Sequence, residues 1–268
     1  MSLAPEGIAS FTAEYPKIHG RLEWLNLHLL IELAPTLKID KAREYLQHGV
    51  CRRLKTIDRC LVNVFTIYPP ARTDILNSAE LNDVMINLQA FIMNVYGLTD
   101  NVAWVYILEQ RRENTIKGGR QGIGLFDRRT QEHLSQRMRD YLSRESMQAW
   151  FGEYSKNFRD ALAHRIPPYV PPYLATPETQ KRWEELDAAS QVALREHRFD
   201  DHERLMSERD ASVKPCPLFR HSYSDSDGTR ALILHGQLLT DALTVVELME
   251  TVMEDVKASG WGAHTSKG

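Results

Sequence analysis

Apolar residues recur at helical spacing along most of this chain. Positions i, i+3, i+4 and i+7 are repeatedly apolar, which is the pattern of helices that bury one face. The longest runs of this kind predict helices over residues 21–34, 40–68, 78–110 and 235–258. Asp40 is the expected N-cap of the second helix, and Asn77 followed by Glu80 predicts a capping box at the start of the third.

The stretch 145–173 predicts a further helix with a sharp end. Its apolar stripe consists of Met147, Trp150, Phe151, Tyr154, Phe158, Ala161 and Leu162. Pro167 and Pro168 forbid continuation of the helix, because proline lacks an N–H and restricts the residue before it. With Pro171 and Pro172, the segment that follows is expected to be extended and polyproline-like.

Residues 130–143 and 177–208 predict two more helices, the second of them highly charged. Within the second, His197 and Asp201 have the i, i+4 spacing of two metal ligands on one helix face. No third ligand is evident nearby, and a solvated helix with ion pairs explains the same pattern. We therefore predict no metal site.

Strand signals are confined to residues 217–234, where Asp227-Gly228 separates two β-capable runs and predicts a hairpin. No internal repeat is apparent. The pattern as a whole predicts an all-α helical bundle with a small appended β-hairpin. We expect a single helical domain over residues 21–258, preceded by an N-terminal segment, 1–20, and followed by a flexible tail, 259–268.

The composition narrows the classes of function. The 33 Lys and Arg residues nearly balance 36 Asp and Glu residues, which argues against a globally basic nucleic-acid binder but not against a local basic patch. The 3 cysteines show no paired metal spacing and suit a reducing compartment. No run of 18 apolar residues occurs, and the N-terminus lacks the pattern of a secretory signal. We expect a cytoplasmic protein without a membrane partner.

The candidate chemistry lies at the end of the helix in 145–173, in the hexapeptide RDALAH. Asp160 and His164 are i and i+4, so the carboxylate can orient the imidazole and raise its basicity. Arg159 lies about 140° around the helix from His164, so one helix does not point both groups at one atom. A site that uses both is easier to build across a two-fold axis. The alternative is that the helix dipole alone favours Arg and His at this end.

This hexapeptide resembles the signature of the HEPN families, in which an arginine, usually next to Asn, Asp or His, precedes a histidine by four to six residues. Arg159, Asp160 and His164 match that signature. The resemblance covers the chain loosely from about residue 20 to 258, and in detail only over 157–173. It implies a dimeric helical bundle that is often a metal-independent ribonuclease. The expected partners are a second copy, RNA, and an antitoxin or other protein, and no cofactor is expected.

Such a ribonuclease needs few groups, because RNA carries its own nucleophile, the 2′-hydroxyl. His164 is the candidate base, with the partner subunit's His164 as acid, and Arg159 is the candidate for stabilising charge on the phosphorane. Asp160 would orient or polarise these groups. The alternative is a non-catalytic dimer of the same class that binds a nucleotide, a nucleic acid or a partner protein.

Three further sets of residues are candidates for substrate binding. Lys117 and Arg120 lie in a glycine-rich, basic stretch, 111–129, that could contact a nucleic-acid backbone or be a mobile loop. Asn157 and Arg165 flank the motif. The third set recurs with heptad spacing in helix 78–110, where it either supports His164 or a ligand, or makes hydrogen bonds between helices. It consists of Asn94 and Asn101, with Asn87 one heptad earlier.

Overall fold

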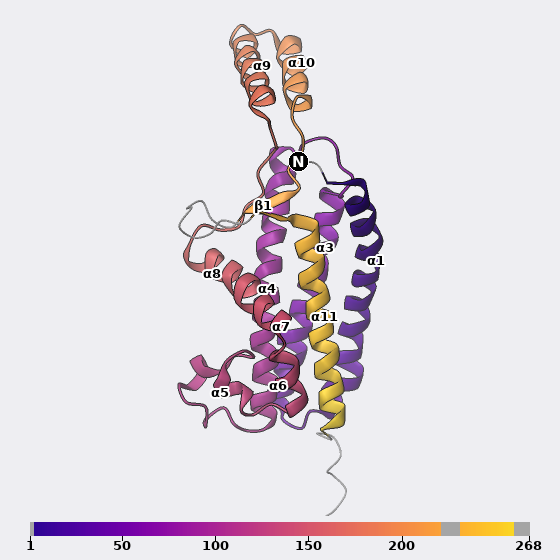
Figure 1. The fold of residues 1–268 in the computed structure, drawn as a ribbon, viewed down its shortest axis with the longest axis vertical. Coiled ribbons are helices and arrows are strands. Elements are labelled where there is room, and N and C mark those ends of the chain that lie inside the picture. The colour runs from indigo at the N-terminus through magenta and orange to yellow at the C-terminus, as the bar shows by residue number, and fades with distance from the viewer. Residues whose placement is uncertain (1–2, 221–230, 260–268) are drawn as a thin grey trace, which may run out of the picture.

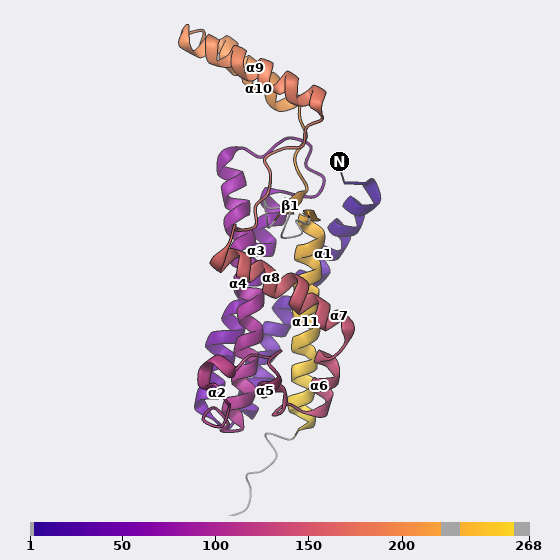
Figure 2. The same ribbon diagram turned by 60° about the vertical axis from the view of Figure 1, so that its left-hand side comes forward.

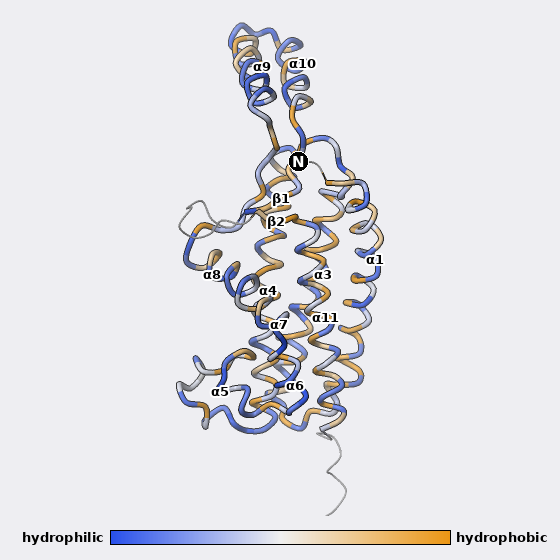
Figure 3. Tube along the Cα trace, viewed as in Figure 1, coloured by the Kyte–Doolittle hydropathy of each residue, from blue (hydrophilic) through white to orange (hydrophobic). Residues whose placement is uncertain are grey.

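The protein is a bundle of long helices (Figure 1), and the computed structural model describes residues 3–220 and 231–259. The four longest bundle helices run side by side in both ribbon views (Figure 2). They are α1 (Pro5–His28), α3 (Cys51–Ile67), α4 (Ser78–Glu109) and α11 (Leu234–Ala258). Along these helices hydrophobic and hydrophilic residues alternate (Figure 3), and the apolar residues form one continuous core. The prediction of a mostly helical fold is confirmed.

The first helix starts earlier than the apolar pattern indicated. It begins at Pro5, so most of the stretch expected to be an N-terminal segment is helical. Phe11 and Tyr15 pack against the core, and the Tyr15 ring stacks on Phe65 with the centroids 4.4 Å apart. Tertiary packing therefore extends a helix whose early turns carry few apolar residues. The helix continues as a π-helical turn, Leu29–Leu33, and a 3₁₀ turn, Ala34–Thr36.

Of the two N-caps predicted for the second and third helices, the first is wrong and the second is confirmed. The second consists of α2 (Asp40–Glu44), a π-helical turn (Tyr45–Val50) and α3. Its N-cap is Ile39 rather than Asp40, whose carboxylate instead accepts a hydrogen bond from Arg43. The capping box of α4 is confirmed, because Asn77 accepts from the Glu80 N–H at 3.0 Å and Glu80 accepts from the Asn77 N–H at 2.9 Å.

The helix in 145–173 crosses the bundle over α4 (Figure 2). It consists of α7 (Glu145–Ala149), a π-helical turn (Trp150–Ser155) and α8 (Lys156–His164), and it ends just before the predicted proline stop. Four members of its apolar stripe are buried, and the other three pack against the core. The buried four are Met147, Trp150, Phe158 and Ala161. This apolar face packs the motif helix, as we call the continuous helix over residues 145–164 that carries Arg159 and His164, against α4.

The single helix predicted over residues 130–143, between α4 and α7, is interrupted in the structure. It contains a 3₁₀ turn (Gly119–Gly122), α5 (Arg128–Gln131) and α6 (Gln136–Leu142). The break arises because Ser135 acts as a new N-cap, with its side-chain oxygen accepting from the Met138 N–H at 3.1 Å.

A helical hairpin projects from one end of the bundle (Figure 1). It consists of α9 (Pro177–Arg195) and α10 (Phe199–Ala211), which replace the single charged helix predicted here. The chain reverses at His197, whose φ is 59°. His197 therefore lies in the turn and does not share a helix face with Asp201, which pairs with Arg198 at 2.5 Å.

The predicted hairpin is present as two short antiparallel strands, β1 (Leu218–Arg220) and β2 (Ala231–Ile233). Phe219 faces Leu232 in the register. The Asp227-Gly228 turn and the predicted tail beyond residue 259 lie outside the described residues. In the part of the chain that the structure describes, no helix is long and apolar enough to cross a membrane.

Candidate functional site

Arg159 lies at the contact between α8 and α4 and is only 25% exposed at its side chain. Its guanidinium carbon lies 4.2 Å from the centroid of the Tyr96 ring, and Nη2 donates to the Tyr96 hydroxyl at 2.8 Å. Nη1 pairs with Asp160 at 2.9 Å. A cation–π contact, a hydrogen bond and an ion pair therefore fix the position of this arginine.

His164 is the last residue of α8, and its side chain is exposed. Among the described residues it has no hydrogen-bond or ion-pair partner. The expected contact with Asp160 is not formed, because Asp160 pairs with Arg159 instead. Arg159 thus faces α4 while His164 faces solvent, as their angular separation predicts.

The residues that flank the motif bind each other. Arg165 turns back and donates through Nη2 to the Asn157 side-chain oxygen at 2.5 Å and to the Asn157 carbonyl at 3.1 Å. Arg165 directly follows His164, and Asn157 lies two residues before Arg159. The pair keeps a guanidinium at the exposed end of the motif helix.

The basic loop, residues 111–129, contains hydrogen bonds and an ion pair of its own. Arg129, at the end of the loop, donates to the Lys117 carbonyl at 2.7 Å and pairs with Asp127 at 2.6 Å, which connects this end to the middle of the loop. Gly118 has φ 93°, a conformation that favours glycine. The Lys117 side chain is exposed to solvent, and the Arg120 side chain lies outside what the structure describes.

Asn94 and Asn101 make hydrogen bonds between helices. Their side-chain oxygens accept from Arg53 of α3, at 3.2 Å and 2.7 Å respectively. Asn87 likewise accepts from Asn63 at 2.9 Å. The heptad of asparagines therefore joins α3 to α4, as the interhelical alternative predicted, and neither Asn94 nor Asn101 contacts His164 in the described structure.

Replacing Gly97 with alanine should destabilise this network. The new Cβ would lie 2.5 Å from the Arg53 Cζ, so the guanidinium must move away from Asn94 and Asn101. We expect the free energy of unfolding to fall by about 1–3 kcal/mol, the cost of leaving polar groups without partners. Gly20→Ala in α1 is the matched control, since nothing lies within 4 Å of its Cβ. Equal stability of the two variants in urea titrations would contradict this expectation.

A pocket of about 480 Å³ opens beside Arg159, between α4, the motif helix and the basic loop. Tyr96, Asp100 and Trp104 line it from α4, and Lys156 lines it from α8. The i, i+4, i+8 spacing of the three α4 residues is the signal that could have identified them in the sequence. The loop contributes Gln121, Ile123, Gly124, Leu125, Phe126 and Asp127.

Asp100 has an unusual environment for a carboxylate. Burial raises its pKa from 3.8 to about 6, and the charges of Arg159 and Arg53 act in the opposite direction. The carboxylate lines the pocket wall rather than the core. A partly desolvated carboxylate in a pocket is characteristic of binding and catalytic sites.

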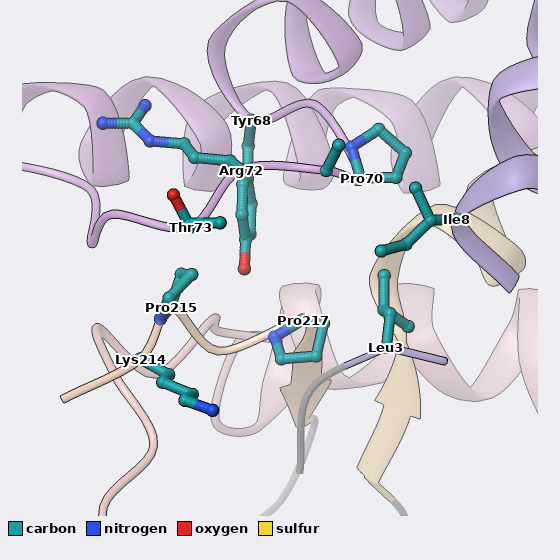
Figure 4. Close-up of a pocket in the computed structure, with 10 residues that line it drawn as sticks. Leu3, Ile8, Tyr68, Pro70, Arg72, Thr73, Lys214, Pro215 and Pro217 are labelled. Atoms are coloured by element: carbon teal, nitrogen blue, oxygen red, sulfur yellow. The ribbon is translucent and has the colours of Figure 1, made fainter. Parts of the chain in front are cut away.

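A second pocket, of about 190 Å³, lies where the α9–α10 hairpin joins the bundle (Figure 4). The Tyr68 hydroxyl points toward Pro215 and Pro217, and Arg72 points away toward its ion-pair partner Glu80, 2.8 Å distant. The walls are mostly apolar, and none of the motif residues lines this pocket.

One group of described residues could approach a metal ion. Ligand atoms of His19, Glu23 and Asp58 lie within 4.8 Å of one another. However, His19 Nδ1 contacts Asp58 at 2.6 Å while Nε2 faces Glu23 at 3.8 Å. A hydrogen bond and an ion pair of the imidazole therefore account for the proximity of these three side chains.

Comparisons of the chain with protein families, with curated proteins and with solved structures found no match.

Proposed function

We propose that this protein is a metal-independent endoribonuclease of the HEPN type that acts as a homodimer. The observation that carries the proposal is the position of His164, an exposed imidazole without a partner in the described structure, one turn after the Arg159–Asp160 ion pair. Histidine is the side chain that most often serves as a general acid or base, and an exposed one is accessible to a bound substrate.

The proposed roles follow from the chemistry of RNA. His164 removes the proton of the 2′-hydroxyl, which attacks the adjacent phosphorus. The partner subunit's His164 protonates the departing 5′-oxygen, and the product carries a 2′,3′-cyclic phosphate. Arg159 stabilises the charge on the phosphorane, and Asp160 and Tyr96 hold the guanidinium in place for this role.

The geometry within one chain favours a composite site. Arg159 is held against α4, whereas His164 faces solvent at the helix end. A second copy of α8 related by a two-fold axis brings the histidine of one subunit toward the arginine of the other. Ile166, which is 44% exposed beside the motif, offers apolar surface for such a contact.

The test is cleavage of a labelled single-stranded RNA by the pure protein in EDTA. We expect fragments with 2′,3′-cyclic phosphate ends, and we expect EDTA to leave the rate unchanged because no step uses a metal. An otherwise identical oligonucleotide with 2′-deoxyribose at the cleaved position should remain intact, since it lacks the nucleophile. Cleavage of the deoxy-substituted bond, or loss of cleavage in EDTA, would contradict the proposed chemistry.

The second candidate function is a non-catalytic dimer that binds a nucleotide, a nucleic acid or a partner protein. The observation in its favour is that Arg159 is already engaged by Tyr96 and Asp160 beside a well-formed pocket. RNA that is bound but never cut, across a panel of sequences, would select this function over the first.

A further inference from the structure

The pocket beside Arg159 combines features that suit a flat, neutral ring with adjacent N–H groups. Tyr96, Trp104 and Phe126 bring aromatic surface to its walls, and Asp100 brings a carboxylate to the same pocket. Lys156 stands at the same pocket from α8, with an exposed side chain. Aromatic walls, an acceptor pair and a cation are the elements that recognise a nucleobase and its phosphate.

The positive charges around Asp100 favour a neutral ligand over a cationic one. Arg53 and Arg159 both act electrostatically on this carboxylate, and Lys156 lines the same pocket. An organic cation would be repelled by these three positive groups, although aromatic walls and a carboxylate could otherwise attract it. A neutral ring that donates hydrogen bonds to the carboxylate meets no such opposition.

Gly124 keeps the carboxylate accessible. A Cβ at this position would lie 3.7 Å from Asp100 Oδ1 and 3.9 Å from the Asp127 Cβ, so a larger side chain would extend over Asp100. The φ of Gly124 lies outside the left-handed region, which means that the backbone does not itself require glycine. The absence of a side chain matters here because it leaves the carboxylate open to the pocket.

We propose that this pocket binds a guanine base of the RNA, with Asp100 accepting hydrogen bonds from both N1–H and the N2 amino group. Guanine is the RNA base that presents two adjacent donors on its Watson–Crick edge, and a carboxylate with two oxygens matches that pair. Adenine, cytosine and uracil each offer one donor next to an acceptor, which would face a carboxylate oxygen. The inference rests on the proposed function and assigns it a base preference next to Arg159.

The test is calorimetric binding of guanosine 3′-monophosphate, inosine 3′-monophosphate and adenosine 3′-monophosphate to the full chain. Inosine lacks only the N2 amino group and so isolates one of the two hydrogen bonds. We expect guanosine to bind about 10-fold or more tightly than adenosine, with inosine between them. Asp100→Asn should weaken guanosine binding about 10-fold or more, because the carboxamide presents an N–H where an acceptor is needed.

Two further variants make the result specific. Gly124→Leu, which leaves every charge in place, should also abolish the guanosine preference. Asp83→Asn is the matched control, since Asp83 is an exposed aspartate of the same helix and does not line this pocket. Equal binding of the three nucleotides, or unchanged guanosine binding by Asp100→Asn, would overturn the inference.

Binding of a mononucleotide does not require cleavage, so the two proposals can fail separately. A guanosine preference in a protein that cuts no RNA would support the pocket and refute the nuclease. Cleavage of RNA without any nucleotide preference would refute the pocket alone.

Discussion

His164→Ala is expected to reduce the rate of RNA cleavage by on the order of 10³-fold or more, because it removes a general base and a general acid from the dimer. The same substitution should change the free energy of unfolding by less than about 1 kcal/mol. The reason is that the side chain is exposed and has no partner in the described structure. Initial rates on a labelled RNA, together with urea titrations, measure the two quantities side by side.

Mixing the variant with wild-type protein tests the composite site. If each dimer needs both histidines, activity should follow the square of the wild-type fraction, so an equal mixture keeps about a quarter of full activity. Independent sites would keep about half. His48→Ala is the matched control, because His48 is also an exposed histidine and it lines none of the pockets described above. Activity that survives His164→Ala would place the chemistry on other residues.

Asp241→Asn should stabilise the protein at pH 8 by about 2–4 kcal/mol relative to the wild type. Asp241 is buried in α11, and burial raises the pKa of its carboxyl from 3.8 to about 7. Trp150 and Gln237 donate hydrogen bonds to Oδ1, at 2.9 Å and 2.8 Å, and only partly offset that burial. Asparagine keeps the acceptor oxygen and has no charge to desolvate.

The sign of this effect follows from proton binding. Between the unfolded pKa of 3.8 and the folded pKa of about 7, the folded state holds a proton that the unfolded state has released. The wild type therefore loses stability as pH rises through this window, and the loss is complete above pH 7. The difference between variant and wild type should vanish near pH 4. A variant that is less stable than the wild type at pH 8 would show that the hydrogen bonds favour the ionised carboxylate.

Much of the architecture followed from local chemistry. The apolar period and the capping box predicted α4 to within a residue or two, because both signals depend on neighbours along the same helix. Pro167 and Pro168 predicted the end of α8 for the same reason. The two-stranded hairpin near residues 217–234 was also expected from its sequence.

Local signals failed where a segment depends on distant contacts. The charged stretch after Pro177 forms two helices rather than one, and Arg209 of the second pairs with Asp187 of the first at 2.6 Å and lies over the Trp183 ring. Periodicity could not locate the reversal at His197, because the antiparallel arrangement is stabilised by such contacts between the two halves.

The candidate site likewise has one part that follows from local helix geometry and another part that depends on tertiary packing. The sequence by itself determined that Arg159 and His164 lie near the end of one helix and diverge, since helix geometry alone sets their angle. Only the tertiary structure decided that Asp160 pairs with Arg159, that Tyr96 holds this arginine, and that Asp100 lines a pocket beside it. Arg159 and Tyr96 lie about sixty residues apart in the sequence, so the packing of side chains between α8 and α4, rather than any local propensity, brings them together.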